Sequence, residues 1–222
     1  VAEASAVADN LPSGRVAWLT ELLGNAPSAS GAVRGFDALL YAAGEREREA
    51  LRPDLVITLG GHIVSKRLKK FLRQTPSLAH WQVSPSGQPA DVFCKLTAVI
   101  EASAADFCSL LSRSEALAGE TAYADLWREG CARLGHPVVE YSSLTAVRRV
   151  MGALPADSVL HLANSSAVRL AELFPLPGRV EVQCNRGVNG IEGSVSAAVG
   201  YAAADTRLNF LLVGDLSFFY DM

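Results

Sequence analysis

The sequence is poor in the residues and patterns that build disulfide frameworks, zinc sites and membrane spans. Its four cysteines, Cys94, Cys108, Cys131 and Cys184, include no C-x-x-C pair, so neither a disulfide framework nor a zinc site is expected. No apolar run approaches the ~20 residues that a membrane span needs. The first ten residues, VAEASAVADN, have neither the basic start nor the apolar core of a secretory signal. We therefore expect a reduced, cytoplasmic setting.

Concentrated charge is scarce as well. The 20 Lys and Arg residues and the 23 Asp and Glu residues give a formal net charge of −3. An acidic chain whose basic run, KRLKKFLR, is only eight residues long does not favour nucleic-acid binding. The first residue is Val instead of an initiator Met, so we expect the chain to be an internal piece of a longer protein.

What the sequence does contain is a repeated alternation of short apolar strands and helices. Its 222 residues, half of them hydrophobic, suffice for one large or two small domains. Strands that alternate with helices and end in glycine are typical of an open parallel sheet. The pattern predicts strands at 15–20, 54–59, 78–83, 158–162, 180–184 and 208–213, and helices at 2–9, 36–43, 45–51, 63–74, 144–154, 166–174 and 192–204, with helical structure over 102–134.

This pattern predicts an α/β fold with two parallel-sheet, Rossmann-like domains. The first domain is expected over residues 1–112 and the second over residues 141–222. A helical connection over residues 113–140 is expected to join them.

The segment from residue 180 to the chain end organises the second domain. The strand 180–184 alternates, and 208–213 is a continuous apolar run, which indicates a strand buried on both faces. Ligands bind at the carboxyl ends of such strands, where Arg186 and the pair Gly214-Asp215 stand. A carboxylate beside glycine suits a hydrated Mg²⁺ that bridges to a phosphate. The alternative is that Asp215 only caps the next helix.

Two further groups of polar residues could carry chemistry. Lys66 and Arg67 lie about one turn into the helix that is predicted after Gly60-Gly61, where two cations can meet a carboxylate; the alternative is a solvated helix face. Ser165 precedes a predicted helix that carries Arg169. This arrangement predicts a helix cap, an anion site, or both.

The motifs of the chain resemble those of thiamine diphosphate enzymes, and within them the 2-succinyl-5-enolpyruvyl-6-hydroxy-3-cyclohexene-1-carboxylate synthases of menaquinone biosynthesis. The resemblance rests on the strings NRGVNGIEG, GDLSFFYDM, LGGHIVSKRL and ANSSAVR. Cys184 stands where the family has Ser, and Glu192 where it has Asp. The family's pyrimidine-binding domain would precede this chain, and more of its diphosphate-binding domain would follow Met222. The two predicted domains would then be the family's middle domain and a truncated diphosphate-binding domain.

The resemblance implies a transferase that decarboxylates 2-oxoglutarate and adds the resulting succinyl-semialdehyde carbanion to isochorismate. It implies that Lys66 and Arg67 contact isochorismate, and that Arg169 and Arg186 contact the 2-oxoglutarate part. A buried salt bridge is the alternative for Arg186. The cofactor would be thiamine diphosphate with Mg²⁺ or Mn²⁺. The residues implied to bind it are Ser165, Gly214, Asp215 and Leu216, with Asp215 as a metal ligand.

The resemblance also implies a homo-oligomer, dimer or tetramer, because the activating Glu would come from a partner subunit. A second metal ligand, an Asn, would lie beyond Met222. We therefore expect the fragment itself to be inactive and to bind no cofactor, and residues 217–222 to lack stable packing. Two alternatives stay open: another thiamine diphosphate lyase or decarboxylase, and a non-catalytic module that binds a nucleotide or anion.

Overall fold

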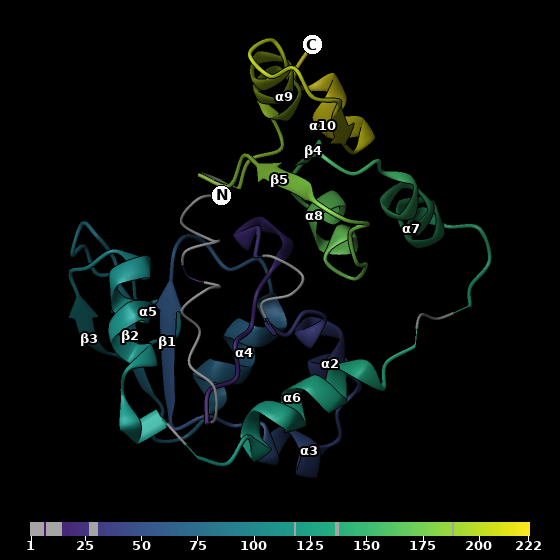
Figure 1. Ribbon diagram of the computed structural model, residues 1–222. Coiled ribbons are helices and arrows are strands. Elements are labelled where there is room, and N and C mark those ends of the chain that lie inside the picture. Colours follow the sequence, from purple (N-terminus) through teal and green to yellow (C-terminus); the bar gives the residue numbers. More distant parts are fainter. Residues whose placement is uncertain (1–6, 8–14, 27–30, 118, 136–137, 188) are drawn as a thin grey trace. The chain divides into compact units, whose positions relative to one another are not determined.

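The computed structural model describes residues 7, 15–26, 31–117, 119–135, 138–187 and 189–222 (Figure 1). Apart from residue 7, the predicted helix 2–9 lies outside these residues. The chain forms two compact units, one of Val1–Thr20 with Ala26–Gly135 and one of Glu21–Asn25 with His136–Met222. The division between residues 135 and 136 falls inside the predicted connection, and each unit is described by itself below.

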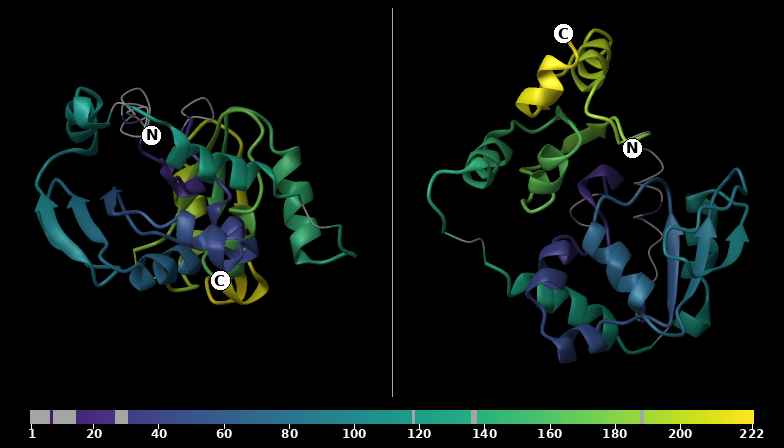
Figure 2. Two further views of the ribbon diagram at one scale, coloured as in Figure 1. Left: turned by 90° about the horizontal axis from the view of Figure 1, so that it is seen from below. Right: turned by 180° about the vertical axis from the view of Figure 1, so that it is seen from behind.

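The first unit contains a parallel sheet of three strands in the order β1-β2-β3. Helices α4 and α5 lie on opposite faces of this sheet (Figure 2), as expected for parallel strands. The strands are β1 (Leu55–Leu59), β2 (Ala79–Val83) and β3 (Leu96–Ile100), and the helices are α2 (Phe36–Ala42), α3 (Glu45–Ala50), α4 (Lys66–Gln74), α5 (Ala104–Ser112), the 3-10 turn η3 (Glu115–Leu117) and α6 (Ala122–Ala132).

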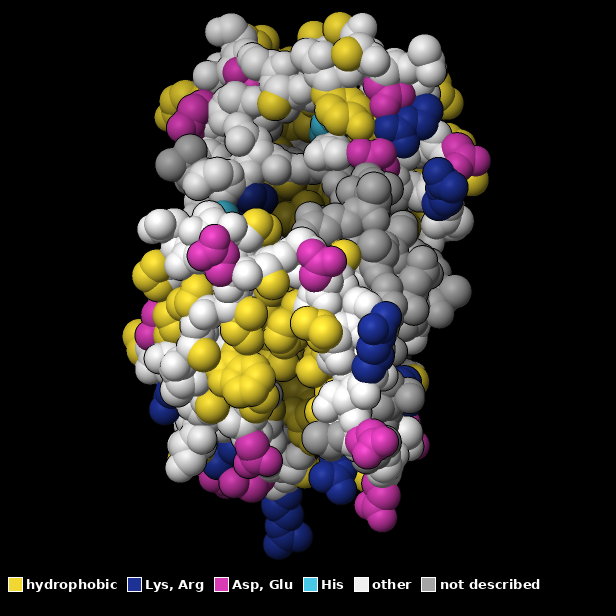
Figure 3. All heavy atoms as spheres, turned by 60° about the vertical axis from the view of Figure 1, so that its left-hand side comes forward, with side chains coloured by type: hydrophobic (Ala, Val, Ile, Leu, Met, Phe, Trp, Pro, Cys, Tyr) yellow, Lys and Arg dark blue, Asp and Glu magenta, His cyan; other side chains and the backbone are white. Residues whose placement is uncertain are grey.

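The core of the first unit is built mainly from helices. Phe36 and Leu39 of α2 pack with Leu68 and Leu72 of α4 and with Trp127 of α6. The two leucines of α4 are four residues apart and therefore share one face of the helix. In the space-filling view, hydrophobic side chains also gather on a hollowed face of this unit, on the side of its sheet (Figure 3).

The second unit contains a second parallel sheet, in the order β5-β4-β6. All five positions of its central strand are buried. The strands are β4 (Ser158–Leu162), β5 (Val180–Cys184) and β6 (Asn209–Leu212), and the helices are α7 (Ser143–Ala153), α8 (Ser166–Ala171), α9 (Ser194–Ala202) and α10 (Asp215–Phe219), with the 3-10 turn η1 (Leu22–Gly24).

Asn25 covers the outer edge of β5. Its Nδ2 donates to the Val182 carbonyl at 2.9 Å, and its Oδ1 accepts from the Val182 amide at 2.7 Å. The side-chain amide thus pairs with the strand as a neighbouring backbone would, and an exposed edge strand is satisfied. The result is that residues 21–25 belong to the second unit.

The α/β fold with two parallel sheets is confirmed, and several elements differ from the prediction. In place of a strand at 15–20, the described residues there form a single bridge, Leu19 to Val33. Helix α4 begins at Lys66 instead of Ile63, because the Ser65 hydroxyl accepts from the Leu68 amide at 3.0 Å and caps the helix. Strand β3 was not predicted.

Two predictions about the second unit are wrong. Strand β6 is only half-buried at all four positions, because it lies at the edge of the described sheet; the strand buried on both faces is β4. Residues 217–222 are not loose, since α10 packs on α9 and Ser217 is buried.

None of the helices in the described part of the chain is long and apolar enough to cross a membrane.

Candidate functional site

The strands of the second unit bring several of the predicted residues to one edge of the sheet. Leu162 of β4 is in register with Cys184 of β5 and with Leu212 of β6. Because the strands are parallel, the segments that follow these three residues leave the sheet at the same edge. Ser165, Arg186 and the pair Gly214-Asp215 come two to three residues after these strand ends.

Asn164 is the residue that joins two of these segments. Its side chain is buried, with 4% of the residue exposed. Its Nδ2 donates to the carbonyl of Asn185 at 2.7 Å and to that of Gly190 at 2.6 Å. Its Oδ1 accepts from Arg186 Nη1 at 2.8 Å. Asn164 therefore fixes both the loop after β5 and the guanidinium group on it. Asn164 lies two residues after the end of β4, and no spacing pattern in the sequence predicts these contacts.

Arg186 is half-buried and bonded to a neutral group. Among the described residues it forms no ion pair with a carboxylate, so the salt-bridge alternative is wrong there. Its Nε is buried without a hydrogen-bond partner in the described chain. A buried cationic donor that lacks a partner is costly, which makes this guanidinium suited to an anionic ligand.

Cys184 stands beside the same amide. Its Sγ lies 3.8 Å from Asn164 Oδ1. Burial raises the pKa of the thiol to about 11, although Arg186 lowers it. The thiol is therefore neutral near pH 7 and can donate to Asn164 as the hydroxyl of a serine would.

Ser165 and Arg169 lie on and before α8. Ser165 has φ 68° and ψ −123°, and its side chain does not cap the helix. The side-chain cap predicted for Ser165 is therefore not formed. A non-glycine residue in this region is strained by ~1–3 kcal/mol, and such residues cluster at functional sites. Arg169 is exposed in the last turn of α8.

Gly214, Asp215 and Leu216 follow β6. A Cβ atom built on Gly214 would meet no atom within 4 Å, so the space in front of this backbone is open. The Asp215 carboxylate is exposed and accepts from the Leu216 amide at 2.8 Å. An exposed carboxylate oxygen suits Mg²⁺ or Mn²⁺ as one ligand. The described residues contain no cluster of three or more His, Cys, Asp or Glu side chains that could hold a metal.

Lys66 and Arg67 lie in the first unit, in the first turn of α4. Arg67 forms an ion pair with Asp37 and lies over the Tyr41 ring, 4.8 Å from its centroid. The other carboxylate oxygen of Asp37 accepts from the Ser65 hydroxyl at 2.5 Å. Arg67 is thus held in place and is not merely a solvated charge, while half of its side chain stays exposed. Lys66 is exposed.

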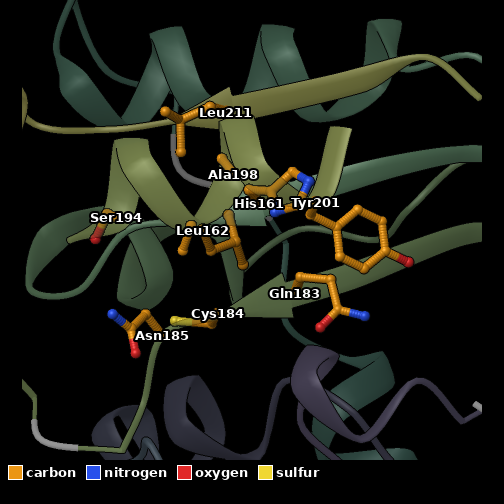
Figure 4. Close-up of a pocket in the computed structure, with 10 residues that line it drawn as sticks. His161, Leu162, Gln183, Cys184, Asn185, Ser194, Ala198, Tyr201 and Leu211 are labelled. Atoms are coloured by element: carbon orange, nitrogen blue, oxygen red, sulfur yellow. The ribbon is translucent and has the colours of Figure 1, made fainter. Parts of the chain in front are cut away.

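A pocket of about 210 Å³ lies between the second sheet and α9 (Figure 4). Its walls are mostly apolar, and the predicted site residues do not line it. The lining residues are His161, Leu162, Gln183, Cys184, Asn185, Ser194, Ala197, Ala198, Tyr201 and Leu211. The predicted site residues of the second unit therefore lie outside this pocket.

Comparison with known proteins identifies the family. Residues 14–161 match the family model described as the middle domain of thiamine pyrophosphate. A 2-succinyl-5-enolpyruvyl-6-hydroxy-3-cyclohexene-1-carboxylate synthase of Bacteroides fragilis is 51% identical over 208 residues, which are 93% of this chain and 37% of that protein. The synthases of Phocaeicola vulgatus and Cytophaga hutchinsonii are 47% and 34% identical, over 93% and 92% of this chain and 37% and 38% of their own length.

The chain therefore spans less than two fifths of the length of these relatives. The family model covers 148 of the 222 residues, from 14 to 161, which is about two thirds of the chain. The chain belongs to the thiamine pyrophosphate enzyme family, and its similar relatives there are 2-succinyl-5-enolpyruvyl-6-hydroxy-3-cyclohexene-1-carboxylate synthases.

Proposed function

We propose that this chain is part of a thiamine diphosphate-dependent synthase that decarboxylates 2-oxoglutarate and adds the four-carbon product to isochorismate, in menaquinone biosynthesis. The observation that carries the proposal is the 51% identity over 93% of the chain to a relative with the name of this synthase. We also propose that the second unit is the beginning of the diphosphate-binding domain.

The donor substrate is assigned to the second unit. Arg186 has a buried Nε without a partner in the described chain and no acidic neighbour bonded to it. A guanidinium group binds a planar carboxylate through two parallel hydrogen bonds. In this proposal Arg186 binds the distal carboxylate of 2-oxoglutarate and Arg169 supports it with a second positive charge.

The acceptor is assigned to the first unit. Arg67 is oriented by Asp37 and Tyr41 and keeps about half of its side chain exposed. Lys66 precedes it at the start of the same helix. Two adjacent cations, one of them held in a fixed orientation, suit the carboxylates of isochorismate.

Thiamine diphosphate would supply the electron sink that decarboxylation requires. Ser165, Gly214 and Leu216 would contact it at the open edge of the second sheet. Asp215 would be one ligand of the Mg²⁺ or Mn²⁺ ion, and the unfilled space at Gly214 leaves room for a phosphate beside it. The protein would work as a homo-oligomer.

The test uses the full-length protein that contains this chain. We expect release of CO₂ from 2-oxoglutarate that depends on thiamine diphosphate and a divalent metal, and a new product when isochorismate is added. Asp215→Asn should remove most of this activity, whereas the matched variant Asp205→Asn, an acid paired with Arg207, should retain it. Full activity without thiamine diphosphate, or equal turnover with any acceptor, would contradict the proposal.

A further inference from the structure

The guanidinium group of Arg186 has two sides with different surroundings. Its Nη1 atom donates to Asn164, whereas its Nε atom has no partner in the described chain. On the basis of the proposed function, we infer that Asn164 is a positioning residue. It takes the Nη1 corner of the Arg186 guanidinium and turns the Nε–Nη2 edge toward the distal carboxylate of a five-carbon 2-oxo diacid. Discrimination between diacids and monoacids therefore depends on an uncharged residue that does not touch the substrate.

The orientation of the Asn164 amide follows from its own contacts. Both carbonyls near Nδ2, those of Asn185 and Gly190 at 2.7 and 2.6 Å, can only accept hydrogen bonds. The amino group must face them, so Oδ1 faces Arg186 Nη1 at 2.8 Å. With 4% of the residue exposed, water does not compete for these bonds. Asn164 has a single arrangement that satisfies all its neighbours.

The remaining edge of Arg186 is the one that lacks a partner. Nε is buried and has no hydrogen-bond acceptor in the described chain. A carboxylate binds a guanidinium side-on, with one oxygen on Nε and the other on an Nη atom. With Nη1 held by Asn164, Nη2 completes this fork. A ligand carboxylate at the Nε–Nη2 edge supplies the hydrogen-bond acceptor for Nε that the described chain does not provide.

A double-mutant cycle on the full-length protein tests this role. The readout is the ratio of kcat/KM for 2-oxoglutarate to kcat/KM for 2-oxopentanoate, which has the same five carbons and lacks the distal carboxylate. We expect Arg186→Ala to lower the ratio roughly ten- to a hundredfold and Asn164→Ala to lower it about tenfold. The double variant should have the same ratio as Arg186→Ala, because Asn164 acts through Arg186.

A purely structural role for Asn164 gives a different result. It predicts that Asn164→Ala lowers kcat/KM equally for both acids, or lowers the ratio further in the Arg186→Ala background; either outcome overturns the inference. Arg186→Lys tests the fork separately, because Asn164 then keeps its two carbonyl contacts and the fold is retained. Because a lysine has a single nitrogen donor, this variant should lose most of the preference for the diacid. A ratio equal to that of the wild type would show that binding of the carboxylate by Nε and Nη2 of Arg186 is not needed.

The same assay separates this inference from the proposed function. If the wild-type protein turns over neither acid, the proposed function fails, and the inference fails with it. If the wild type prefers the diacid, Arg186→Ala abolishes the preference and Asn164→Ala leaves it unchanged, the proposed function stands and the positioning role of Asn164 is wrong.

Discussion

The two sheets of the chain have the same parallel strands and different cores. In the first unit the buried cluster consists mainly of helix and loop residues, and the strand residue beside it, Val56, is only partly buried. In the second unit all five residues of the central strand β4 are buried. The first core is centred on helices and the second on a strand, so substitutions in the two sheets should have different costs.

Each central strand nevertheless carries a buried histidine. His80 of β2 bonds through Nε2 to Thr58 Oγ1 at 2.9 Å, and its ring lies 4.8 Å from that of Phe93. His161 of β4 bonds through Nε2 to Asn209 Oδ1 at 2.8 Å. Its ring lies 5.1 Å from that of Tyr201. In both sheets, the buried histidine forms a hydrogen bond to a neighbouring strand and contacts an aromatic ring.

The other ring nitrogen of His80 lies in a different environment from its Nε2. His80 is fully buried, and its Nδ1 has no hydrogen-bond partner in the described chain. Asp91 lies 3.9 Å away, too far for a hydrogen bond. Burial lowers the pKa of His80, and Asp91 opposes this only in part. The first unit therefore contains a group whose protonation opposes folding.

The largest effect should come from shortening a buried side chain of β4. Leu160 is fully buried, and Leu160→Ala should lower the free energy of unfolding by ~2–5 kcal/mol. The matched variant Leu59→Ala, at a half-buried position of β1, should cost less than half as much. Urea unfolding followed by circular dichroism measures both. Equal costs would contradict the difference between the cores.

The same experiment can separate the units, because Trp18, Trp81 and Trp127 all lie in the first. If the units unfold independently, Leu160→Ala should leave the urea midpoint measured by tryptophan fluorescence unchanged. It should lower the midpoint of the part of the circular dichroism signal that comes from the second unit.

The next effect concerns the acceptor site of the first unit. Arg67→Ala in the full-length protein should raise KM for isochorismate roughly ten- to a hundredfold with little change for 2-oxoglutarate, because one charge-assisted contact of ~1.5–3 kcal/mol is lost. Lys70→Ala, an exposed cation on the same helix, is the control and should behave as wild type. Equal changes for both substrates would show that Arg67 acts on the fold.

The strands of the second sheet were predictable from sequence because burial fixes their composition. The predictions 158–162 and 180–184 match β4 and β5, since apolar or alternating runs of that length have few alternatives. Strand β3 was missed because two of its five positions are exposed and its register with β2 is irregular at His80. A half-exposed strand of five residues leaves too weak a pattern.

The position of several proposed site residues at one edge of the second sheet could be predicted from the sequence, and their contacts could not. Motif spacing brought Arg186 and Ser165 to one edge of the sheet. The partner of Arg186 depends on the path of the loop after β5, which the Asn164 amide fixes through two backbone carbonyls. Bonds of a side chain to distant backbone leave no spacing rule in a sequence, so neither this contact nor that of Asp37 with Arg67 could be read from it.

A smaller effect is expected from the buried histidine of the first sheet. Because the pKa of folded His80 lies below that of the unfolded chain, about 6.5, the unfolded chain binds more protons. Stability from this group is present above pH ~6.5 and is lost as the pH falls toward the folded-state pKa, by at most ~1.4 kcal/mol per pH unit.

His80→Gln should remove this loss between pH 7 and pH 5, and urea unfolding at both values measures it. The matched variant is His161→Gln, at the corresponding strand of the other unit. If the free energy of unfolding depends on pH in the same way in the wild type and in His80→Gln, His80 is not the group responsible for the loss.

The smallest effect concerns how helices are capped in the two units. In the first unit α5 is capped locally, by the Ser103 hydroxyl that accepts from the Asp106 amide at 3.1 Å. In the second unit α9 is capped from a distance. The Asp221 carboxylate accepts from the amides of Val195 and Ser196 at 2.6 and 2.9 Å.

These bonds tie the segment after α10 to the start of α9. The Ser196 hydroxyl, which also donates to Asp221, contributes most to lowering the pKa of that carboxyl. A lowered folded-state pKa means that the contribution to stability is present above pH ~3.9 and is lost as the pH falls through the folded value.

Asp221→Asn should therefore lower the unfolding midpoint of the second unit at pH 7 and have little effect near pH 2. Ser142→Ala, which removes the hydroxyl that caps α7 by accepting from the Thr145 amide, should lower stability by a similar amount at both values, because neither group titrates in this range. Measuring amide hydrogen exchange at Val195 and Ser196 would locate the effect: unchanged protection in Asp221→Asn at pH 7 would mean that α9 is stabilised by its packing on the sheet and not by this distant cap.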